Sequence, residues 1–328
     1  MLHWAILGTG FISNTVVDAI TASDGSQVDL IAGRNRSKVA EFQKRHCITR
    51  RSSYENALSD PNIDAVYIGL PNDQHHPFAI AAAQAGKAVL SEKSLTTTMD
   101  DAHSLVQAIR ANGTFFVEGL MYLAHPVHRR FVELLSDGRL GTLRSISARY
   151  GADIAHLVNP AGRGTIYNLG CYPVSLIHLV VQTQRGPDAF ANRSVSGAGI
   201  ANATDGTICD AALAVRFDNQ VLATVQASDS YGNTSEFSVA GDKGVLRFGT
   251  NPWLPVAGDN TIIWQPHDAR PEPIVVHDRH DAFYHQIKMV EAHVAAGETE
   301  AARPSPRLSD SLEIMELLTE WERLCLAS

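Results

Sequence analysis

Short apolar runs alternate with helix-like segments along the first third of the chain. The apolar runs lie at residues 4–7, 28–32, 65–70 and 88–90, and the segments with helical spacing lie at 11–20, 37–46, 78–85 and 99–111. Apolar runs without polar alternation are typical of parallel strands that are buried on both faces. The repeated order of strand, helix and strand therefore predicts a doubly wound parallel sheet over residues 1–120.

Beyond about residue 120 the pattern changes to strand-like segments separated by turns. These segments lie at residues 143–150, 194–203, 208–217, 221–227, 236–240 and 245–248. Turn signals stand where hairpins would reverse, at Asp205-Gly206, Asp218-Asn219 and Asp242-Lys243-Gly244. The pattern predicts an α+β domain over residues 121–328 that contains a large, mostly antiparallel sheet.

The last part of the chain combines an irregular stretch with two helices. Residues 249–273 include five prolines, and we expect them to form irregular surface. Apolar residues at helical spacing then predict helices at about residues 280–296 and 308–326.

Composition and charge narrow the class of protein. The 328 residues suit about two domains, and 45% hydrophobic with 19% charged residues is ordinary for a globular chain. The 27 basic and 35 acidic residues give a net charge of −8, so the chain lacks the positive field that attracts phosphate backbones or anionic lipid. We therefore expect neither nucleic acid nor a membrane as a partner.

Cysteine usage and the absence of long apolar stretches bear on the compartment. The four cysteines, Cys47, Cys171, Cys209 and Cys325, include no C-x-x-C pair, which favours free thiols over a disulfide framework or structural zinc. The first residues do not resemble a secretory signal, and no run of about 18 apolar residues is present. These features predict a cytoplasmic protein.

A glycine motif directly follows the first predicted strand and opens a helix. It reads Gly8-Thr9-Gly10-Phe11-Ile12-Ser13. The two glycines permit a tight turn and let the backbone approach a pyrophosphate, whose charge is favoured at a helix N-terminus. Ser13 replaces a third glycine and is small enough for close packing of helix on strand. The motif predicts a Rossmann dinucleotide site, and the alternative is a glycine turn without a ligand.

The end of the second predicted strand bears on which nicotinamide cofactor is preferred. An acid there would bind the adenine ribose hydroxyls, but the chain reads Ala32-Gly33-Arg34-Asn35-Arg36. A 2′-phosphate would find a charge-assisted partner in Arg34, with Arg36 as a second candidate. We therefore expect NADP(H) to be preferred and NAD(H) to be the alternative. For Lys38, the alternative interpretation is a solvated residue at the start of a helix.

Three later stretches carry a resemblance to a known family. They read Leu70-Pro71-Asn72-Asp73-Gln74-His75, Ala85-Gly86-Lys87-Ala88-Val89-Leu90-Ser91-Glu92-Lys93 and Asn168-Leu169-Gly170-Cys171-Tyr172-Pro173-Val174. Together they resemble the glucose-fructose oxidoreductase, inositol dehydrogenase and rhizopine-catabolism (Gfo/Idh/MocA) family. Tyr172, and Met121-Tyr122 before His125-Pro126, are most similar to its dihydrodiol dehydrogenase and aldose dehydrogenase branch.

The resemblance implies roles for two catalytic residues and for a cofactor-side loop. It implies that Lys93 projects to the nicotinamide and that Tyr172 exchanges a proton with the substrate oxygen. The other residues that it places beside the cofactor are Leu70, Pro71, Asn72, His75 and Glu92. The candidate substrate contacts are Asn168, Tyr122 and, more weakly, Glu118, together with Tyr172.

Physical chemistry supports the catalytic pair independently. Hydride transfer to a carbonyl leaves an alkoxide, which needs a proton donor and a nearby positive charge. An ammonium group such as that of Lys93 stabilises a phenolate and lowers the pKa of a neighbouring tyrosine. A solvated loop cation and a core tyrosine are the alternatives for Lys93 and Tyr172. His178 is an alternative acid, but its place in an apolar helix favours a core histidine.

The chain departs from the family pattern at three positions. Ser94 stands where a proline usually follows the lysine, Asn168 where many members have aspartate, and Leu123 where the aldose branch has arginine. An amide can orient a hydroxyl group but cannot supply a negative charge. These departures bear on the substrate more than on the chemistry.

The sequence thus predicts an NADP(H)-preferring oxidoreductase acting on a sugar, polyol or cyclic diol. The alternatives are a glycoside hydrolase that retains NAD and a nucleotide-sensing protein without activity. We expect a homo-oligomer, in the form of a dimer, because the family often pairs its open sheet face between subunits. His277, His280 and His285 do not share one helical face, and the family is metal-free, so we expect no metal.

Overall fold

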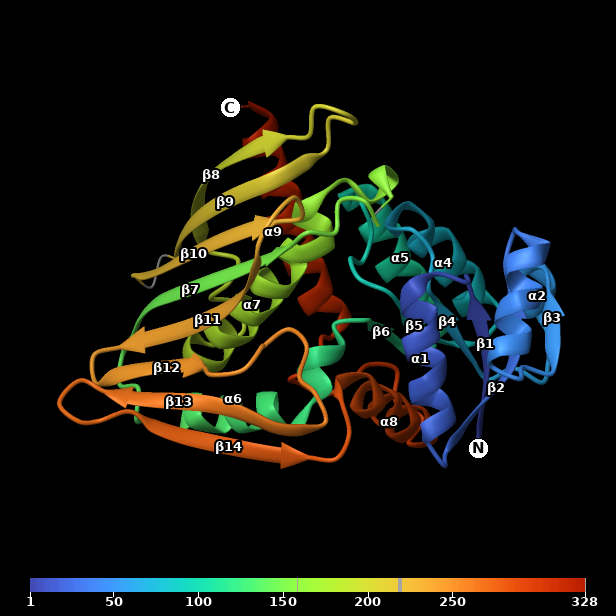
Figure 1. Ribbon diagram of the computed structural model, residues 1–328, viewed down its shortest axis with the longest axis horizontal. Coiled ribbons are helices and arrows are strands. Elements are labelled where there is room, and N and C mark those ends of the chain that lie inside the picture. Colours follow the sequence, from blue (N-terminus) through green and yellow to red (C-terminus); the bar gives the residue numbers. More distant parts are fainter. Residues whose placement is uncertain (158, 218–219, 328) are drawn as a thin grey trace. The chain divides into compact units, whose positions relative to one another are not determined.

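The computed structural model describes residues 1–157, 159–217 and 220–327 (Figure 1). It contains two compact units, and each is described by itself. The first unit comprises Met1–Met121 and Ala282–Leu312, and the second comprises Tyr122–Asp281 and Glu313–Ser328. The predicted turn at Asp218-Asn219 lies outside the described residues.

The first unit is built on a parallel sheet of six strands in the order β3-β2-β1-β4-β5-β6. Its strands are β1 (Leu2–Leu7), β2 (Ser26–Ala32), β3 (Arg50–Ser52), β4 (Ala65–Ile68), β5 (Ala88–Ser91) and β6 (Phe116–Glu118). Its helices are α1 (Phe11–Ala22), α2 (Arg36–Arg45), α3 (Tyr54–Ser59), α4 (His75–Gln84), α5 (Met99–Asn112) and α8 (Ala282–Ala295). This arrangement confirms the predicted doubly wound sheet and adds β3 and β6, which are short.

Alternation along the strands divides the core of the first unit into two layers. Trp4 and Ile6 of β1 pack with side chains of α1, α2 and α8, among them Ile287 and Val290. Helix α4 packs on β4 and β5. Because both faces are covered, the central strands β1, β4 and β5 carry runs of buried apolar residues, as the sequence pattern indicated.

Helix α8 joins the first unit although it follows the second along the chain. It packs against α1, and Lys288 pairs with Asp24 and Glu291. The predicted domain boundary between residues 120 and 121 stays a prediction. The first compact unit also includes Ala282–Leu312.

The second unit contains a sheet of eight strands in the order β14-β13-β12-β11-β7-β10-β9-β8. The strands are β7 (Leu143–Ala152), β8 (Arg193–Ala201), β9 (Ile208–Phe217), β10 (Val221–Ser228), β11 (Asn233–Gly241), β12 (Gly244–Phe248), β13 (Gly258–Pro266) and β14 (Glu272–Asp278). All pairs are antiparallel except β7 with β10. The predicted mostly antiparallel sheet is therefore confirmed.

The prediction of irregular surface for residues 249–273 is wrong. Strand β13 and the start of β14 lie there and form a hairpin. Pro266 is the last residue of β13, and Pro273 lies on β14, an edge strand of the sheet. Prolines are tolerated at strand ends and edges, because no ladder hydrogen bond is lost there.

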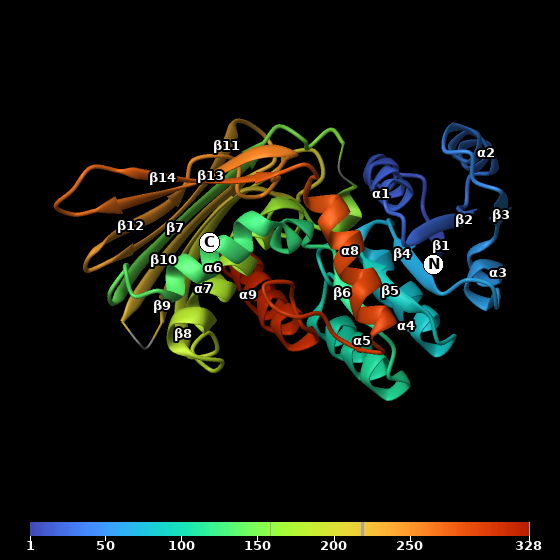
Figure 2. The ribbon, with the colours of Figure 1, turned by 90° about the horizontal axis from the view of Figure 1, so that it is seen from below.

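Helices cover one face of this sheet and leave the other face open (Figure 2). The covering helices are α6 (Pro126–Ser136), α7 (Cys171–Arg185) and α9 (Leu308–Ala327), and the observed bounds of α8 and α9 confirm the two predicted C-terminal helices. On the open face, Leu222 is 56% exposed and is paired with Ser145 and Arg216 of the neighbouring strands. Along β9 and β10, exposed side chains on this face alternate with buried side chains on the face that the helices cover.

Two further observations concern the chain as a whole. Cys47, Cys171, Cys209 and Cys325 are all free thiols, as predicted. Within residues 1–157, 159–217 and 220–327, no helix has the length and apolar character needed to cross a membrane.

Candidate functional site

The turn between β1 and α1 requires glycine at one position and has room for a larger side chain at another. Gly8 has a φ of +107°, and a Cβ atom on it would lie 2.5 Å from the Gly69 carbonyl oxygen. Gly10 precedes α1 with φ −70° and ψ 174°, and a Cβ atom there would meet nothing nearer than 3.8 Å. The start of α1 has no side-chain cap and no acidic residue in its first turn within the described chain. Its backbone N–H groups are therefore suited to an anion.

Ser13 closes the packing behind this turn. It is fully buried in α1, and a Cβ atom on Gly69 would lie 2.5 Å from its hydroxyl oxygen. A small side chain is therefore needed where the helix meets the end of β4. Thr9 lies in the same turn, and Phe11 and Ile12 are the first residues of α1, with Phe11 strongly exposed.

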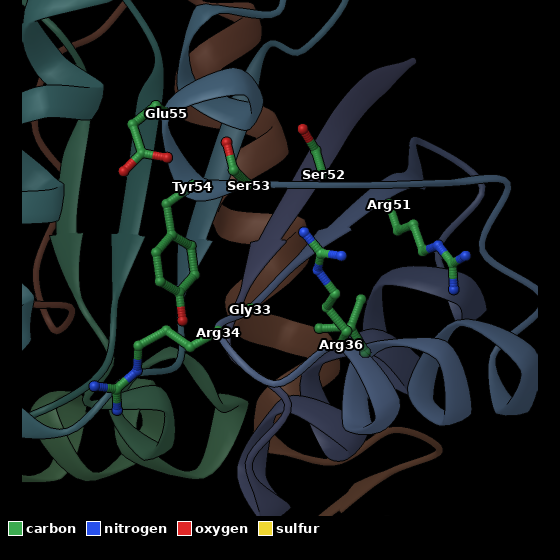
Figure 3. Close-up of a pocket in the computed structure, with 9 residues that line it drawn as sticks. Gly33, Arg34, Arg36, Arg51, Ser52, Ser53, Tyr54 and Glu55 are labelled. Atoms are coloured by element: carbon green, nitrogen blue, oxygen red, sulfur yellow. The ribbon is translucent and has the colours of Figure 1, made fainter.

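A cavity of about 570 Å³ lies at the end of β2 and is rich in cationic side chains (Figure 3). The lining residues are Gly33, Arg34, Arg36, Val39, Arg51, Ser52, Ser53, Tyr54 and Glu55. Three arginines and two serines line the cavity together with one glutamate, so the cavity favours an anion with several acceptor oxygens. Lys38 of the same basic stretch is exposed and is not among the lining residues.

Tyr54 forms one wall of the cavity and contacts Arg34. Its ring packs edge-on against Phe78 with centroids 4.7 Å apart, and its hydroxyl group interacts with Arg34 (Figure 3). Burial raises the pKa of Tyr54, although the Arg34 guanidinium opposes this shift. Tyr54 therefore stays a neutral phenol that interacts with the exposed Arg34 side chain.

No sequence motif marks the wall formed by Arg51, Ser52, Ser53 and Tyr54. These residues lie at the end of β3, and β3 pairs with β2 through Ala32 and Ser52. The strand order of a doubly wound sheet places the end of the third strand beside the end of the second. That rule, applied to the three-residue strand, is the signal that could have found them.

His75 links the loop after β4 to the turn that carries Lys93. The buried imidazole lies 2.8 Å from the Leu70 carbonyl oxygen through Nε2 and 2.8 Å from the Ser94 carbonyl oxygen through Nδ1. Burial lowers the pKa of His75. The Lys93–Ser94 peptide bond is cis. A histidine contact thus restrains the turn at which the family usually has proline, and Pro71 and Asn72 lie in the same loop.

Two buried carboxyl groups lie close to Lys93 at the ends of β5 and β6. Glu92 accepts a hydrogen bond of 3.0 Å from the Tyr67 hydroxyl, and burial raises its pKa against the effect of the Lys93 ammonium group. Glu118 is 1% exposed, and burial raises its pKa to about 7, while Ser311 and Lys93 are among the groups that lower it. Glu118 therefore keeps its proton to a higher pH than an ordinary glutamate does. Its substrate contact stays a prediction.

Tyr172 and Asn168 lie one turn apart on continuous helical backbone of the second unit. A π-helical turn, Ile166–Gly170, leads directly into α7. The backbone N–H of Asn168 donates to the Gly164 carbonyl oxygen 3.0 Å away. Both residues are buried. Helical backbone thus begins six residues before Tyr172, at Ile166. Since dipole effects fall off within the first turn, the dipole contributes less to Tyr172 than a helix start there would.

Aromatic rings surround Tyr172 on several sides. Tyr150 packs edge-on against it with centroids 5.3 Å apart, and Trp253 stacks on Tyr150 at 5.7 Å. The Tyr122 hydroxyl donates to the Tyr172 carbonyl oxygen at 3.1 Å and lies 2.7 Å from the Ser175 hydroxyl. Burial raises the pKa of Tyr150 to about 12, so this neighbour stays protonated. We call Tyr122, Tyr150, Tyr172 and Trp253 the aromatic cluster.

A buried carboxyl group that no sequence motif marks lies beside Asn168. Asp229 directly follows β10 and is 3% exposed, and the neighbouring Asn168 side chain lowers the pKa of its carboxyl group. Burial raises the pKa of Asp229 to about 6, and the nearby charges of Asp210 and Asp205 act in the same direction. The carboxyl group is therefore mostly ionised at neutral pH, and its ionisation is sensitive to its neighbours.

The remaining candidate histidines have other partners. His178 is buried and lies 2.7 Å from a Glu313 carboxylate oxygen, which agrees with a satisfied core histidine. His277 pairs with Asp259 on the exposed surface of β13 and β14. Among the described residues, no group of three or more His, Cys, Asp or Glu side chains could hold a metal ion.

The predicted site residues thus form two sets, one in each compact unit. Gly8, Gly10, Arg34 and Arg36 lie with Lys93, Glu92, His75 and Glu118 in the first unit. Tyr122, Asn168 and Tyr172 lie together in the second unit. The pairing of Lys93 with Tyr172 stays a prediction.

Comparison with known proteins agrees with both halves of this description. Residues 2–120 match the family described as "Oxidoreductase family, NAD-binding Rossmann fold", and residues 128–247 match the "GFO/IDH/MocA C-terminal domain". The chain belongs to the Gfo/Idh/MocA oxidoreductase family. It is therefore an NAD(P)-dependent oxidoreductase of the Gfo/Idh/MocA family.

Individual relatives of this Gfo/Idh/MocA protein include diol dehydrogenases. Trans-1,2-dihydrobenzene-1,2-diol dehydrogenase of Macaca fuscata fuscata is 28% identical over 262 residues, which cover 77% of this chain and 76% of the relative. The enzyme of that name from Xenopus laevis is 26% identical over 279 residues, or 82% of each chain.

Solved structures share the fold over almost the whole chain. A 3-ketoreductase from Actinomadura kijaniata, in complex with NADP and TDP-benzene, has a TM-score of 0.86 at 23% identity and covers 99% of this chain and 98% of its own. Aldose-aldose oxidoreductase from Caulobacter crescentus has a TM-score of 0.83 at 20% identity, with coverage of 99% and 98%. A levoglucosan dehydrogenase in complex with NADH and levoglucosan has a TM-score of 0.82 at 17% identity, with coverage of 99% and 97%.

Proposed function

We propose that this protein is an NADP(H)-preferring oxidoreductase that moves hydride between the nicotinamide and a hydroxyl or carbonyl carbon of a sugar, polyol or cyclic diol. The observation that carries the proposal is the glycine turn with its uncapped helix start beside a cavity lined by three arginines. The names of the relatives, which include diol dehydrogenases and an aldose-aldose oxidoreductase, support the class of substrate.

The cofactor fits the residues of the first unit. A Cβ atom on Gly8 would fill the turn, and the N–H groups at the start of α1 suit a pyrophosphate. Arg34, Arg36 and Arg51 suit a 2′-phosphate at the end of β2. One similar structure holds NADP and another holds NADH, so the preference for NADP(H) rests on these arginines.

Lys93 and Tyr172 handle the proton in this proposal. When bound, the nicotinamide cofactor supplies or accepts the hydride. The Tyr172 hydroxyl donates its proton to the substrate oxygen during reduction and recovers a proton from the substrate hydroxyl during oxidation. The Lys93 ammonium group stabilises the phenolate that forms in between. Tyr150 stays protonated beside Tyr172, because burial raises the pKa of Tyr150 to about 12.

The second unit supplies the substrate contacts. Asn168 offers an amide to a substrate hydroxyl, and the aromatic cluster offers an apolar wall to the C–H face of a ring. Tyr122 uses its hydroxyl to hold the backbone of Tyr172, so its contribution includes orienting that residue. The open sheet face with Leu222 supports a homodimer.

A spectrophotometric screen tests this function. Purified protein is offered aldoses, ketosugars, inositols and diols with NADP⁺ and with NAD⁺, and the reduced nicotinamide is followed. Lys93→Met and Tyr172→Phe should abolish turnover while leaving NADPH binding largely intact. Tyr150→Phe is the matched control and should keep most of the activity.

The same screen separates the competing functions. Normal rates in both Lys93→Met and Tyr172→Phe would refute the catalytic assignment. Release of sugar from glycosides without net reduction, by protein that retains NAD through purification, would indicate the hydrolase. Tight NADPH binding with no oxidation across the whole panel would indicate a nucleotide-sensing protein.

A further inference from the structure

Lys93 stands in a largely buried turn whose two ends are held in different ways. Before the lysine, the Glu92 N–H donates to the Ile68 carbonyl oxygen 3.0 Å away, at the ends of β5 and β4. After it, the Ser94 carbonyl oxygen lies 2.8 Å from Nδ1 of His75. The first contact belongs to the backbone, but the second comes from a side chain. A single substitution can therefore remove the contact at one end of the turn and leave the sheet intact.

The His75 ring contacts two carbonyl oxygens at once. Nδ1 faces Ser94, and Nε2 lies 2.8 Å from the Leu70 carbonyl oxygen in the loop after β4. A carbonyl oxygen only accepts hydrogen bonds, whereas a neutral imidazole carries one N–H donor and one bare nitrogen. The ring can therefore donate to both oxygens only as the imidazolium, with a proton on each nitrogen. As a neutral ring it donates to one of them.

The imidazolium form of His75 is disfavoured in this environment. The residue is fully buried, and burial removes the hydration that a charged ring needs. The Lys93 ammonium group also disfavours a second proton on the ring, while the Asp73 carboxylate favours it. The adjacent histidine, His76, pairs with Asp101 of α5 instead. The net effect lowers the pKa of His75, so near neutral pH its ring carries one proton.

The exposure of the two acceptors favours one position for that proton. Ser94 is fully buried, so water cannot replace a donor at its carbonyl oxygen. Leu70 is only partly buried, so its loop has access to water. A buried acceptor that loses its donor keeps the whole cost of desolvation, whereas a hydrated acceptor does not. A proton on Nδ1 therefore gives the lower free energy, with the bare Nε2 facing the partly exposed loop.

We propose that His75 is a positioning residue for Lys93, and that its Nδ1–H holds the Ser94 carbonyl oxygen and with it the turn that carries the ammonium group. This proposal rests on the proposed function, in which Lys93 stabilises the Tyr172 phenolate. Misplacement of a reacting or catalytic group by about 1 Å can cost about 100-fold in rate, so the restraint of one turn is large enough to measure. Both ring nitrogens face backbone oxygens, and His75 acts through the turn.

Two substitutions separate the two contacts of the ring. By bond connectivity, the amide nitrogen of asparagine stands near the place of Nδ1, and that of glutamine stands near the place of Nε2. His75→Asn therefore keeps a donor for Ser94, and His75→Gln keeps a donor for Leu70 alone. Both variants replace the ring with a neutral amide, so each controls for the lost packing of the other. His76→Gln is the matched control, because His76 pairs with Asp101 at 3.2 Å.

Steady-state kinetics with trans-cyclohexane-1,2-diol and NADP⁺ provide the first readout. His75→Gln should lower kcat by about 10-fold or more, while KM for NADP⁺ stays within about threefold. His75→Asn should keep at least about a third of kcat, and His76→Gln should stay within about twofold of the unmodified protein. Equal losses of kcat in His75→Asn and His75→Gln, or an unchanged kcat in His75→Gln, would overturn the proposal.

Hydrogen exchange provides a readout that does not depend on turnover. The backbone amides of residues 92–97 are followed in the unmodified protein and in the three variants. His75→Gln should raise their exchange rate by about 10-fold, the change expected for one lost buried hydrogen bond, and the other two variants should not. If the diol is not oxidised but this pattern holds, the proposed reaction fails and the hold of His75 on the turn stands. Equal exchange in His75→Asn and His75→Gln would contradict the proposal.

Nitrogen NMR of histidine labelled with ¹⁵N in the ring checks where the proton lies. The His75 signals are identified by their loss in His75→Asn. Near neutral pH, Nδ1 should carry the proton and Nε2 should not. A proton on Nε2 alone would refute the proposed contact, because a bare Nδ1 cannot donate to the Ser94 carbonyl oxygen.

Discussion

The two glycines of the turn after β1 allow the folding and the binding roles of one motif to be separated. In the folded protein a Cβ atom on Gly8 would lie 2.5 Å from a backbone oxygen, whereas a Cβ atom on Gly10 would lie 3.8 Å from its nearest neighbour. The two changes Gly8→Ala and Gly10→Ala therefore add the same methyl group in opposite environments.

The expected cost of Gly8→Ala follows from its geometry. A φ of +107° is rarely adopted by L-residues and costs about 1–3 kcal/mol, and the Gly69 backbone must also move. A total of about 2–4 kcal/mol would lower the melting temperature of the first unit by roughly 5–15 °C. Gly10 has φ −70° and ψ 174°, which alanine adopts freely, so Gly10→Ala should cost less than about 1 kcal/mol.

For the affinity of the cofactor, Gly10→Ala should have the larger effect. The methyl group of Gly10→Ala lies where the backbone would approach the cofactor pyrophosphate, and loss of one charge-assisted hydrogen bond raises Kd by about 10-fold or more. Differential scanning fluorimetry measures stability, and titration of NADPH fluorescence measures affinity. A Gly8→Ala variant that melts with the unmodified protein would refute the steric reasoning. Unchanged NADPH affinity in Gly10→Ala would refute the placement of the cofactor at this turn.

Three further predictions concern the basic cavity, Asp229 and the open sheet face. Arg34→Ala and Arg51→Ala should each lower kcat/KM for NADP⁺ by about 10–100-fold and change kcat/KM for NAD⁺ much less. Lys38→Ala, at an exposed residue, is the control. An equal loss with both cofactors would exclude a 2′-phosphate contact. Because the pKa of Asp229 is raised to about 6, the folded state holds that proton more tightly than the unfolded state, and its contribution to stability falls as pH rises from about 4 to 6. Asp229→Asn should therefore gain stability relative to the unmodified protein across that window, by up to about 3 kcal/mol in urea unfolding above pH 6, and a constant difference from pH 4 to 8 would contradict the shift. Leu222→Lys should turn a dimer into a monomer in sedimentation, whereas Leu254→Lys, an exposed residue outside the strands, should not; an unchanged mass for Leu222→Lys would move the interface elsewhere.

Much of the architecture could be predicted because hydrophobic periodicity is a local property. The apolar runs of the first unit became buried parallel strands, and the predicted strand at residues 208–217 matches β9 (Ile208–Phe217). Strands β3 and β6 were missed because three residues carry too little pattern. Strand β13 is hidden in the sequence because prolines usually interrupt strands, whereas here they lie at a strand end and on an edge strand.

The candidate site was only partly predictable, for a different reason. The Gly8 turn and the Arg34 strand end are contiguous motifs, so the sequence alone identifies them. Arg51 reaches the same cavity only because β3 pairs with β2. Asp229 meets Asn168 only because β10 packs on the turn before α7. No local pattern distinguishes such residues from solvated ones.

The amino-acid sequence by itself determined the kinds of chemical group present, the order of strands and helices, and the glycine turn suited to a dinucleotide. Those features depend on side chains a few residues apart. The tertiary structure alone decided that Tyr54 interacts with Arg34, that His75 holds the Lys93 turn, and that Asp229 is buried beside Asn168. Burial and charge depend on which distant segments pack together, and these two quantities set the pKa of a carboxyl group and the ligand that it can bind.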